Sequence, residues 1–146
     1  MTSVTVSPDS TATVNESRVP KTEIRLCTLD EFKVLGDSLF EEHYEEIARN
    51  KQVMVLKPNW PVYHKAEEQG TLFTFLAKRE GKCIGYSANF IGNHLHYADL
   101  LYCQNDLLFV SKDHRGSSLG LKLMKATEKH AKSLGCKLML LSLIHI

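Results

Sequence analysis

The 146-residue chain lacks an excess of either charge, since 18 Lys and Arg face 17 Asp and Glu and leave a formal net charge of +1. Proteins that bind nucleic acids or membrane surfaces without sequence preference need a basic excess on one face. The sequence also lacks any apolar run near the roughly twenty residues that a membrane-spanning helix requires. We therefore expect no nucleic acid and no membrane among its partners.

Cysteines are few and widely spaced, and the start of the chain lacks the basic residues and apolar stretch of a secretory signal. Cys27, Cys83, Cys103 and Cys136 include no Cys-x-x-Cys pair. Because this spacing suits neither a disulfide framework nor a zinc site, we expect reduced, buried cysteines in a cytoplasmic protein.

Residues 1–22 lack hydrophobic periodicity and are rich in Ser, Thr, Val and Pro. Nothing in this stretch offsets the entropy lost on ordering it, so the composition predicts a disordered N-terminal tail. The pattern that follows predicts one folded domain over 23–146.

Within that domain the hydrophobic pattern alternates between helical and strand periods. Thr28 and Glu31 have capping-box spacing, and Glu80-Gly81 is typical of a hairpin turn. The predicted strands are 23–27, 71–79, 82–91 and 137–143, and the segments 95–101 and 107–110 after a turn at Gly92-Asn93 also carry strand character. The predicted helices are 28–47, 61–69 and 120–134. The order is one strand, two helices, three antiparallel strands, one helix and one strand, which is an α/β (α+β) fold with a mixed sheet.

Four glutamates gather near the end of the first predicted helix, at Glu41, Glu42, Glu45 and Glu46. Acidic side chains there oppose the helix dipole, so helix stability does not explain them. Two interpretations stay open: a solvated face, or an electrostatic attraction for a cationic substrate.

The stretch with the most chemical content runs from the predicted strand Leu107–Val110 through Arg115-Gly116-Ser117-Ser118-Leu119-Gly120 into a helix. A helix N-terminus presents unpaired N–H groups and the positive end of its dipole, glycine allows close approach of the backbone, and Arg115 adds a charged donor. The segment therefore predicts an anion site suited to a diphosphate. It is neither a Walker loop nor a dinucleotide fingerprint, because the required Gly-Lys-Ser/Thr ending and three spaced glycines are absent.

These residues resemble the GCN5-related N-acetyltransferases (GNAT family), whose acetyl-CoA motif is Gln/Arg-x-x-Gly-x-Gly/Ala between a strand and a helix. Here it reads Arg115-x-x-Ser118-x-Gly120, and the order of elements is similar from about Glu23 to the end. The segments HLHY (94–97), NDLLFV and HRG look most like the versions in tailed bacteriophages. Ser118 replaces a glycine, so a positive φ there would cost about 1 kcal/mol, while its hydroxyl could donate to a phosphate oxygen.

The resemblance implies a GNAT-like, mostly antiparallel central sheet flanked by helices, with acetyl-CoA as co-substrate. It implies an N-acetyltransferase that moves the acetyl group to a primary amine, on a small molecule or a peptide, by direct attack. The implied cofactor-binding residues are Leu108, Phe109, Val110, Arg115, Gly116, Ser117, Ser118, Leu119 and Gly120. The alternative is a catalytically inactive acyl-CoA-binding or interaction module.

An attacking amine must lose a proton, and Asp106 and His96 are the predicted catalytic residues, with His94 and Asp99 as further candidates. Asp106 is predicted to begin the cofactor-binding strand, where several family members carry an acidic base; a strand-edge cap is the other interpretation. His94 and His96 share one face of the predicted strand, but two histidines make no metal site without a third ligand, so we expect no metal.

Three aromatic or histidine residues are ambiguous in the sequence. Trp60 and Tyr97 are interpreted as either substrate-pocket or core residues. His43 is interpreted as a surface or helix-face residue with no discernible partner.

The last six residues, 141–146, read LSLIHI, which CTG TCT CTT ATA CAC ATC encodes. That nucleotide sequence resembles the transposon end used in sequencing-library adapters. One hypothesis is adapter read-through after about Leu140, so that the last helix and strands of the family fold are missing and the chain is inactive. The other interpretation is a natural strand. The upstream nucleotides decide between them.

Overall fold

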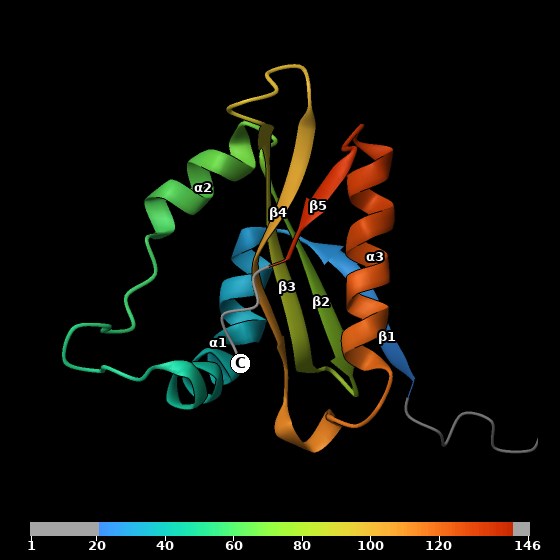
Figure 1. Ribbon diagram of the computed structural model, residues 1–146. Coiled ribbons are helices and arrows are strands. Elements are labelled where there is room, and N and C mark those ends of the chain that lie inside the picture. Colours follow the sequence, from blue (N-terminus) through green and yellow to red (C-terminus); the bar gives the residue numbers. More distant parts are fainter. Residues whose placement is uncertain (1–20, 142–146) are drawn as a thin grey trace, which may run out of the picture.

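The computed structural model describes residues 21–141 (Figure 1). Residues 1–20 of the predicted tail (1–22) and residues 142–146 of the adapter-like stretch (141–146) lie outside the described residues. The elements are β1 (Thr22–Cys27), α1 (Leu29–Ile47), α2 (Trp60–Glu68), β2 (Leu72–Arg79), β3 (Lys82–Asn93), β4 (Leu101–Val110), a 3₁₀ turn (Lys112–His114), α3 (Leu119–Ser133) and β5 (Leu138–Leu140). This sequence of elements confirms the predicted order of helices and strands.

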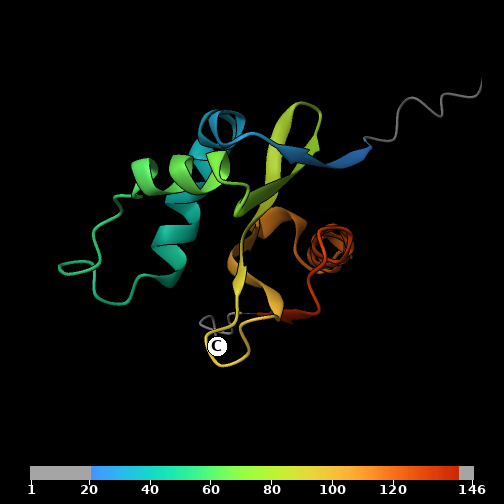
Figure 2. The ribbon, with the colours of Figure 1, turned by 90° about the horizontal axis from the view of Figure 1, so that it is seen from above.

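The five strands form one sheet in the order β1-β2-β3-β4-β5. Neighbours from β1 to β4 are antiparallel, whereas β5 runs parallel to β4. The helices α1 and α2 lie on one face of the sheet and α3 lies on the other (Figures 1 and 2). The predicted fold class, a mixed and mostly antiparallel sheet flanked by helices, is confirmed.

Local sequence signals explain where the helices begin. Thr28 Oγ1 accepts a hydrogen bond from the Glu31 N–H at 3.2 Å, and Glu31 Oε1 accepts one from the Thr28 N–H at 3.5 Å, which confirms the capping box. Asn59 caps α2, and Pro61 stands in the first turn, where its missing N–H costs no hydrogen bond. These caps fix the starts of the two helices that cover one face of the sheet.

Each face of the sheet has its own hydrophobic core. The buried residues on the α1/α2 face are Leu29, Phe32, Leu39, Ala66, Leu72, Leu76, Cys83, Tyr86 and Phe109. Those on the α3 face are Phe73, Phe75, Ala77, Ile84, Cys103, Leu119, Leu123, Ala131 and Cys136. The four cysteines are free thiols, and three of them are buried as predicted, whereas Cys27 is half-buried.

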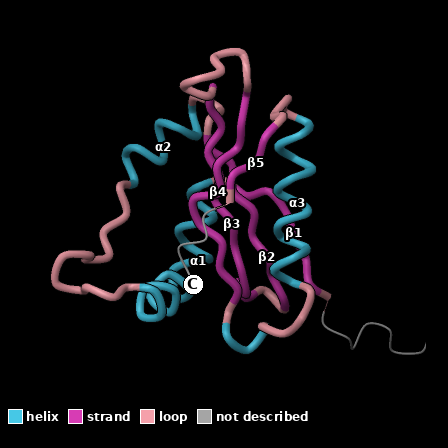
Figure 3. Tube along the Cα trace, viewed as in Figure 1, coloured by secondary structure: helices cyan, strands magenta, loops and turns pink. Residues whose placement is uncertain are grey.

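Two predictions for the connection between β3 and β4 are wrong. Gly92-Asn93 belongs to β3 rather than to a turn, and the predicted strand at 95–101 is mostly a loop over 94–100 (Figure 3). As a result β4 begins at Leu101. Asp106 therefore lies inside the strand, not at its start as predicted.

The hydrogen bonds of this connection explain the error. His94 N–H donates to the Leu100 carbonyl at 2.9 Å, and Asn93 Nδ2 donates to the Ala98 carbonyl at 2.9 Å. The asparagine thus supports the loop with its side chain while its backbone continues the strand. A turn-forming residue can therefore belong to a strand and still stabilise the adjacent loop through its side chain, which the hydrophobic periodicity alone does not indicate.

Candidate active site

The ladder between β3 and β4 is interrupted at Asp106. Ala88 pairs with Leu107 and Asn89 pairs with Asn105, so Asp106 is the extra residue of a β-bulge. A bulge breaks the alternation of side chains between the two faces of a sheet. Two consecutive side chains consequently lie on the α1/α2 face, where Asp106 contacts α2 and Leu107 packs against the core.

A chain of buried polar side chains supports the bulge. Asn105 Nδ2 donates to Asn89 Oδ1 at 2.9 Å and to the Leu107 carbonyl at 3.0 Å. Asn89 Nδ2 donates to Ser87 Oγ at 3.0 Å, and Ser87 Oγ lies 2.9 Å from Thr127 Oγ1 on α3. All four side chains are buried. This buried polar chain, Asn105–Asn89–Ser87–Thr127, links the bulge to α3.

Beyond the bulge, β4 has an open edge within the described residues. β5 pairs only with Tyr102–Gln104, so the sheet opens between the two strands after that point. Ser111 N–H donates to the Ile84 carbonyl of β3 at 2.9 Å. Along a strand, successive residues direct their N–H and C=O groups alternately to its two sides. Since Ser111 points its N–H toward β3, Leu108 and Val110 point their backbone groups toward the open edge. An extended ligand that carries amide groups can bind there as an added strand.

The open edge leads into the N-terminus of α3. Gly116, in the loop before the helix, has φ 80°, a left-handed conformation that favours glycine. Ser118 is the N-cap with φ −78°, so the backbone strain considered for a non-glycine residue at this position is absent. The first turn of α3 contains no acidic residue. Its backbone N–H groups and the helix dipole can therefore hold an anion.

The side chain of Arg115 is fixed by contacts within the chain. Its Nε donates to the Val110 carbonyl at 3.0 Å, its two terminal nitrogens donate to the Glu46 carboxylate, and its guanidinium lies 5.2 Å from the centre of the Phe109 ring. The hydrogen bonds between the two side chains lower the pKa of Glu46 and raise the pKa of Arg115. The charge of Arg115 is thus compensated by α1, which the sequence did not indicate.

The glutamates near the end of α1 contact the loop before α3. Glu42 Oε1 accepts a hydrogen bond from the Lys112 N–H at 3.0 Å, and Glu46 binds Arg115. Both contacts join residues about seventy positions apart in the sequence. A purely solvated face is therefore the wrong description of Glu42 and Glu46.

The carboxylate of Asp106 is exposed and accepts a hydrogen bond from Tyr63 of α2. The Tyr63 Oη lies 2.8 Å from Asp106 Oδ2, and the Tyr63 ring stacks on Phe90 with the ring centres 5.8 Å apart. Burial and the hydrogen bond to Asp106 raise the pKa of Tyr63, so the phenol stays protonated and donates. Tyr63 lies 43 positions from Asp106 and belongs to no motif, so the sequence offered no signal for it.

The structure does not bring His96 to Asp106. His96, together with Asp99 and Tyr97, is exposed on the loop that precedes β4. A strand rises about 3.3 Å per residue, so the five steps from Leu101 to Asp106 place the base of this loop roughly 16 Å from the carboxylate. Among residues 21–141, no group of three His, Cys, Asp or Glu is arranged to hold a metal ion.

A cavity of about 410 Å³ lies on the α1/α2 face next to the bulge. It is lined by Phe32, Phe40, His43, Tyr44, Ile47, Ala48, Met54, Val55, Leu56, Lys57, Pro58, Trp60, Tyr63, Tyr86 and Leu107. Tyr63 and Leu107 connect it to Asp106, since one donates to the carboxylate and the other is its neighbour in β4. Trp60 lines this cavity, as one of its two sequence interpretations expected.

His43 lies on a helix face but is buried and has a partner, so a surface position without a partner is wrong. Its Nδ1 lies 2.6 Å from Tyr86 Oη, and its ring stacks on Phe109 with the ring centres 4.4 Å apart. His43 follows the buried Leu39 by four residues, so the two share the inward face of α1. The partner is on β3 and cannot be seen from the helix sequence.

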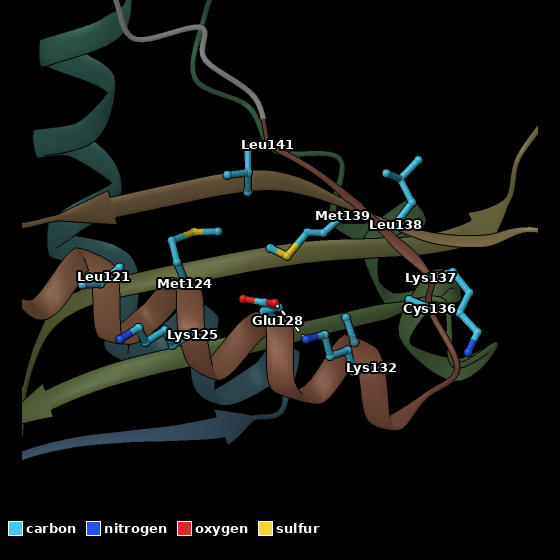
Figure 4. A pocket seen from close by; sticks show the side chains of 11 residues that line it. Leu121, Met124, Lys125, Glu128, Lys132, Cys136, Lys137, Leu138, Met139 and Leu141 are labelled. Carbon is cyan, nitrogen blue, oxygen red and sulfur yellow. Dashed lines mark ion pairs between the residues drawn. The ribbon is translucent and has the colours of Figure 1, made fainter.

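A second hollow, of about 370 Å³, lies between α3 and β5 (Figure 4). Leu121, Met124 and Met139 give it apolar walls, and lysines stand around it, among them Lys125 and also Lys132, which pairs with Glu128 at 3.1 Å. It lies on the α3 side of the open edge. Apolar walls with cationic groups near them suit a ligand that has both an apolar arm and anionic groups.

A match to a protein-family model, which covers most of the chain, shows the family. Residues 37–144 match the model of the acetyltransferase (GNAT) family. The chain belongs to the GNAT family. The matched residues include the bulge and the segment Arg115-x-x-Ser118-x-Gly120, so the resemblance read from the sequence is confirmed at family level.

Solved structures share the GNAT fold at low sequence identity. A GCN5-related N-acetyltransferase from Ralstonia eutropha JMP134 aligns with a TM-score of 0.68 at 16% identity, over 84% of this chain and 83% of that one. A predicted acetyltransferase with acetyl-CoA from Clostridium acetobutylicum aligns with a TM-score of 0.64 at 11% identity, over 84% and 80%. An aminoglycoside acetyltransferase from an uncultured soil metagenomic sample aligns with a TM-score of 0.64 at 19% identity, over 83% and 76%.

Two searches were negative. No curated protein matches this GNAT sequence significantly. Among the residues that the structure describes, no helix is long and apolar enough to cross a membrane.

Proposed function

We propose that this GNAT protein transfers an acetyl group from acetyl-CoA to a primary amine by direct attack. The observation that carries the proposal is the opening of the sheet at the Asp106 bulge, where the open edge of β4 leads straight into the N-terminus of α3. The edge offers backbone groups and the helix end attracts an anion. The bulge places a carboxylate between them and the α1/α2 cavity.

The residues at the open edge fit acetyl-CoA, which supplies the acetyl group as a thioester. Leu108 offers its backbone N–H and carbonyl, and Val110 its backbone N–H, to the amides of the pantetheine arm, since the Val110 carbonyl accepts from Arg115 Nε. Arg115–Gly120 offer the N-terminus of α3 to the diphosphate, and Gly116 leaves room for close approach. The apolar walls at Leu121 and Met124 flank the same side of the sheet. These residues are the proposed cofactor site.

Asp106 is the proposed general base. An amine with an ordinary pKa near ~10.4 is protonated at neutral pH and must lose a proton before it attacks. The Asp106 carboxylate accepts that proton, directly or through water, while the hydrogen bond from Tyr63 orients it. A backbone N–H of β4 polarises the acetyl carbonyl. The new N–C bond then replaces the C–S bond, and the leaving thiolate takes up the second proton that the nitrogen loses after the attack.

Several finer assignments stay predictions. The single domain over 23–146, the cytoplasmic location and the resemblance to phage proteins rest on the sequence alone. The acceptor is a small-molecule or peptide amine. Support for an amine acceptor comes from the fold, which this chain shares with an aminoglycoside acetyltransferase and with a glucosamine-6-phosphate N-acetyltransferase from Arabidopsis thaliana.

Calorimetry followed by a thiol-release assay tests the proposal. We expect acetyl-CoA to bind with one-to-one stoichiometry and a panel of primary amines to include at least one that releases CoA thiol. Binding without thiol release for any amine would favour the inactive acyl-CoA-binding module. No binding of acetyl-CoA would contradict the proposal.

A further inference from the structure

The α1/α2 cavity is apolar around most of its wall. Among its fifteen lining residues none is acidic, and Lys57 and His43 are its only basic side chains. The remaining side chains are aliphatic or aromatic, and Phe40, Trp60 and Tyr63 form a cluster with ring centres 5.8–6.0 Å apart from one ring to the next. A volume of about 410 Å³ lies within the usual range for small-molecule sites.

The loop between α1 and α2 extends this apolar character to the surface. Four consecutive apolar side chains are exposed there: Val53 (77%), Met54 (55%), Val55 (69%) and Leu56 (42%). Met54, Val55 and Leu56 line the cavity. Contiguous exposed apolar side chains beside a cavity usually mark a binding site.

The exposed carboxylate of Asp106 lies beside the cavity, next to two of its lining residues. Tyr63 lines the cavity and donates to Asp106, and Leu107 lines it next to Asp106 in the chain. Glu42 and Glu46 of α1 do not supply acidic lining, because both are engaged with the loop before α3. The site therefore offers the Asp106 carboxylate beside the cavity and apolar side chains around most of the cavity wall.

We propose that the acceptor is a monoamine with an aromatic or aliphatic body, held with its amino group at Asp106 and its body in the α1/α2 cavity. This inference rests on the proposed acetyl transfer and adds the substrate class. Polyamines and aminoglycosides carry several ammonium groups, for which the cavity offers no carboxylates. Burial of such cations beside apolar side chains is unfavourable.

Fluorescence tests the binding step without catalysis. Trp60 is the single tryptophan of the sequence and lines the cavity, so its emission reports on the site. We expect a saturable change in emission with phenethylamine and none with spermidine at the same concentrations. The reverse preference would overturn the inference.

Kinetics test the same inference through the acyl-transfer reaction. In a series from butylamine to octylamine, kcat/KM should rise roughly fourfold per added methylene, since each buried methylene contributes about 0.8 kcal/mol. The matching diaminoalkanes and kanamycin should be far poorer substrates. A flat series, or a preference for the polycations, would overturn the inference.

Two neighbouring loop residues provide a matched pair of variants. Met54 and Val53 are both exposed and apolar, but only Met54 lines the cavity. Met54→Lys should raise the KM for phenethylamine at least fivefold and leave the acetyl-CoA KM unchanged, whereas Val53→Lys should change neither. Equal effects of the two variants would overturn the cavity assignment.

The tests separate the two proposals. If phenethylamine binds but no amine is acetylated, the proposed transfer fails and the cavity assignment stands. If transfer occurs and favours spermidine or kanamycin, the transfer proposal stands and the substrate class is wrong.

Discussion

The two faces of the sheet are assembled in different ways. On the α3 face, the open edge of β4, the loop at 115–120 and the start of α3 follow one another along the chain. On the α1/α2 face, the cavity takes its residues from α1, α2, the loop between them, β3 and β4. A contiguous site can be recognised from the spacing of its residues, whereas an assembled one becomes visible only in the folded chain.

Two polar contacts join α1 and α2 to the end of β4 and to the loop before α3. Tyr63 of α2 donates to Asp106 at the bulge, and Glu46 of α1 binds Arg115 in the loop before α3. If the α3 face binds the cofactor and the α1/α2 face binds the amine, substitutions at these contacts should separate cofactor affinity from turnover.

The largest expected effect is at the bulge. Asp106→Asn should lower kcat by about 10²–10⁴-fold, because the amide cannot accept the proton that the attacking amine loses. The affinity for acetyl-CoA should stay nearly the same. Thiol-release assays measure kcat, and calorimetry measures the affinity for acetyl-CoA.

Asp99→Asn is the matched control for this substitution. Asp99 is an exposed aspartate on the loop before β4, away from the bulge. Its replacement should leave kcat within about twofold of the unsubstituted protein, since surface substitutions are usually small in effect. If Asp99→Asn lowered kcat and Asp106→Asn did not, the base would lie on that loop.

The next largest effect is expected on acetyl-CoA affinity, from substitutions in and beside the loop before α3. Arg115→Ala should weaken acetyl-CoA binding by roughly 1.5–3 kcal/mol, the contribution of a charge-assisted hydrogen bond. Glu46→Gln removes the competing anion, so it should leave binding equal or tighter if Arg115 reaches the diphosphate. Calorimetry distinguishes the cases: equal weakening by both variants would show that the pair only holds the loop.

A smaller loss of stability is expected from the hydrogen-bonded side chains Asn105, Asn89, Ser87 and Thr127, which link the bulge to α3. Thr127→Val keeps the shape of the side chain but removes the hydroxyl next to Ser87 Oγ. The free energy of unfolding in urea should fall by about 1–3 kcal/mol, because a buried polar group loses a partner. The exposed Ser133→Ala on the same helix should stay within about 0.5 kcal/mol. Equal stabilities of the two variants would argue against a structural role for these hydrogen-bonded side chains.

The smallest effect is expected at the N-cap of α3. Ser118 has φ −78°, so Ser118→Gly relieves no strain, and its side chain caps no backbone N–H. Acetyl-CoA affinity should change by less than about 0.5 kcal/mol. A clear loss of affinity would mean that the hydroxyl donates to a phosphate oxygen.

The sequence predicted the features whose signals are local. The order of elements, the Thr28–Glu31 capping box, the fold class and the segment from Arg115 to Gly120 all depend on residues close together in the chain. The β3–β4 loop was missed because Asn93 supports the loop from inside a strand.

The features that were missed depend on long-range pairing. The bulge at Asp106 is a property of the register between two strands. Tyr63, Glu46 and His43 acquire their roles from partners more than forty positions away. No spacing rule connects such residues, so the acceptor side could be found only in the structure.

The central claim is that the two faces meet at Asp106 to join an acetyl group to an amine. The most direct test incubates the protein with acetyl-CoA and phenethylamine and counts released thiol and acetylated amine, the latter by mass spectrometry. The account predicts one amide for each thiol, with both lost in Asp106→Asn while acetyl-CoA still binds. Thiol release without an amide, or an undiminished amide yield in the variant, would contradict it.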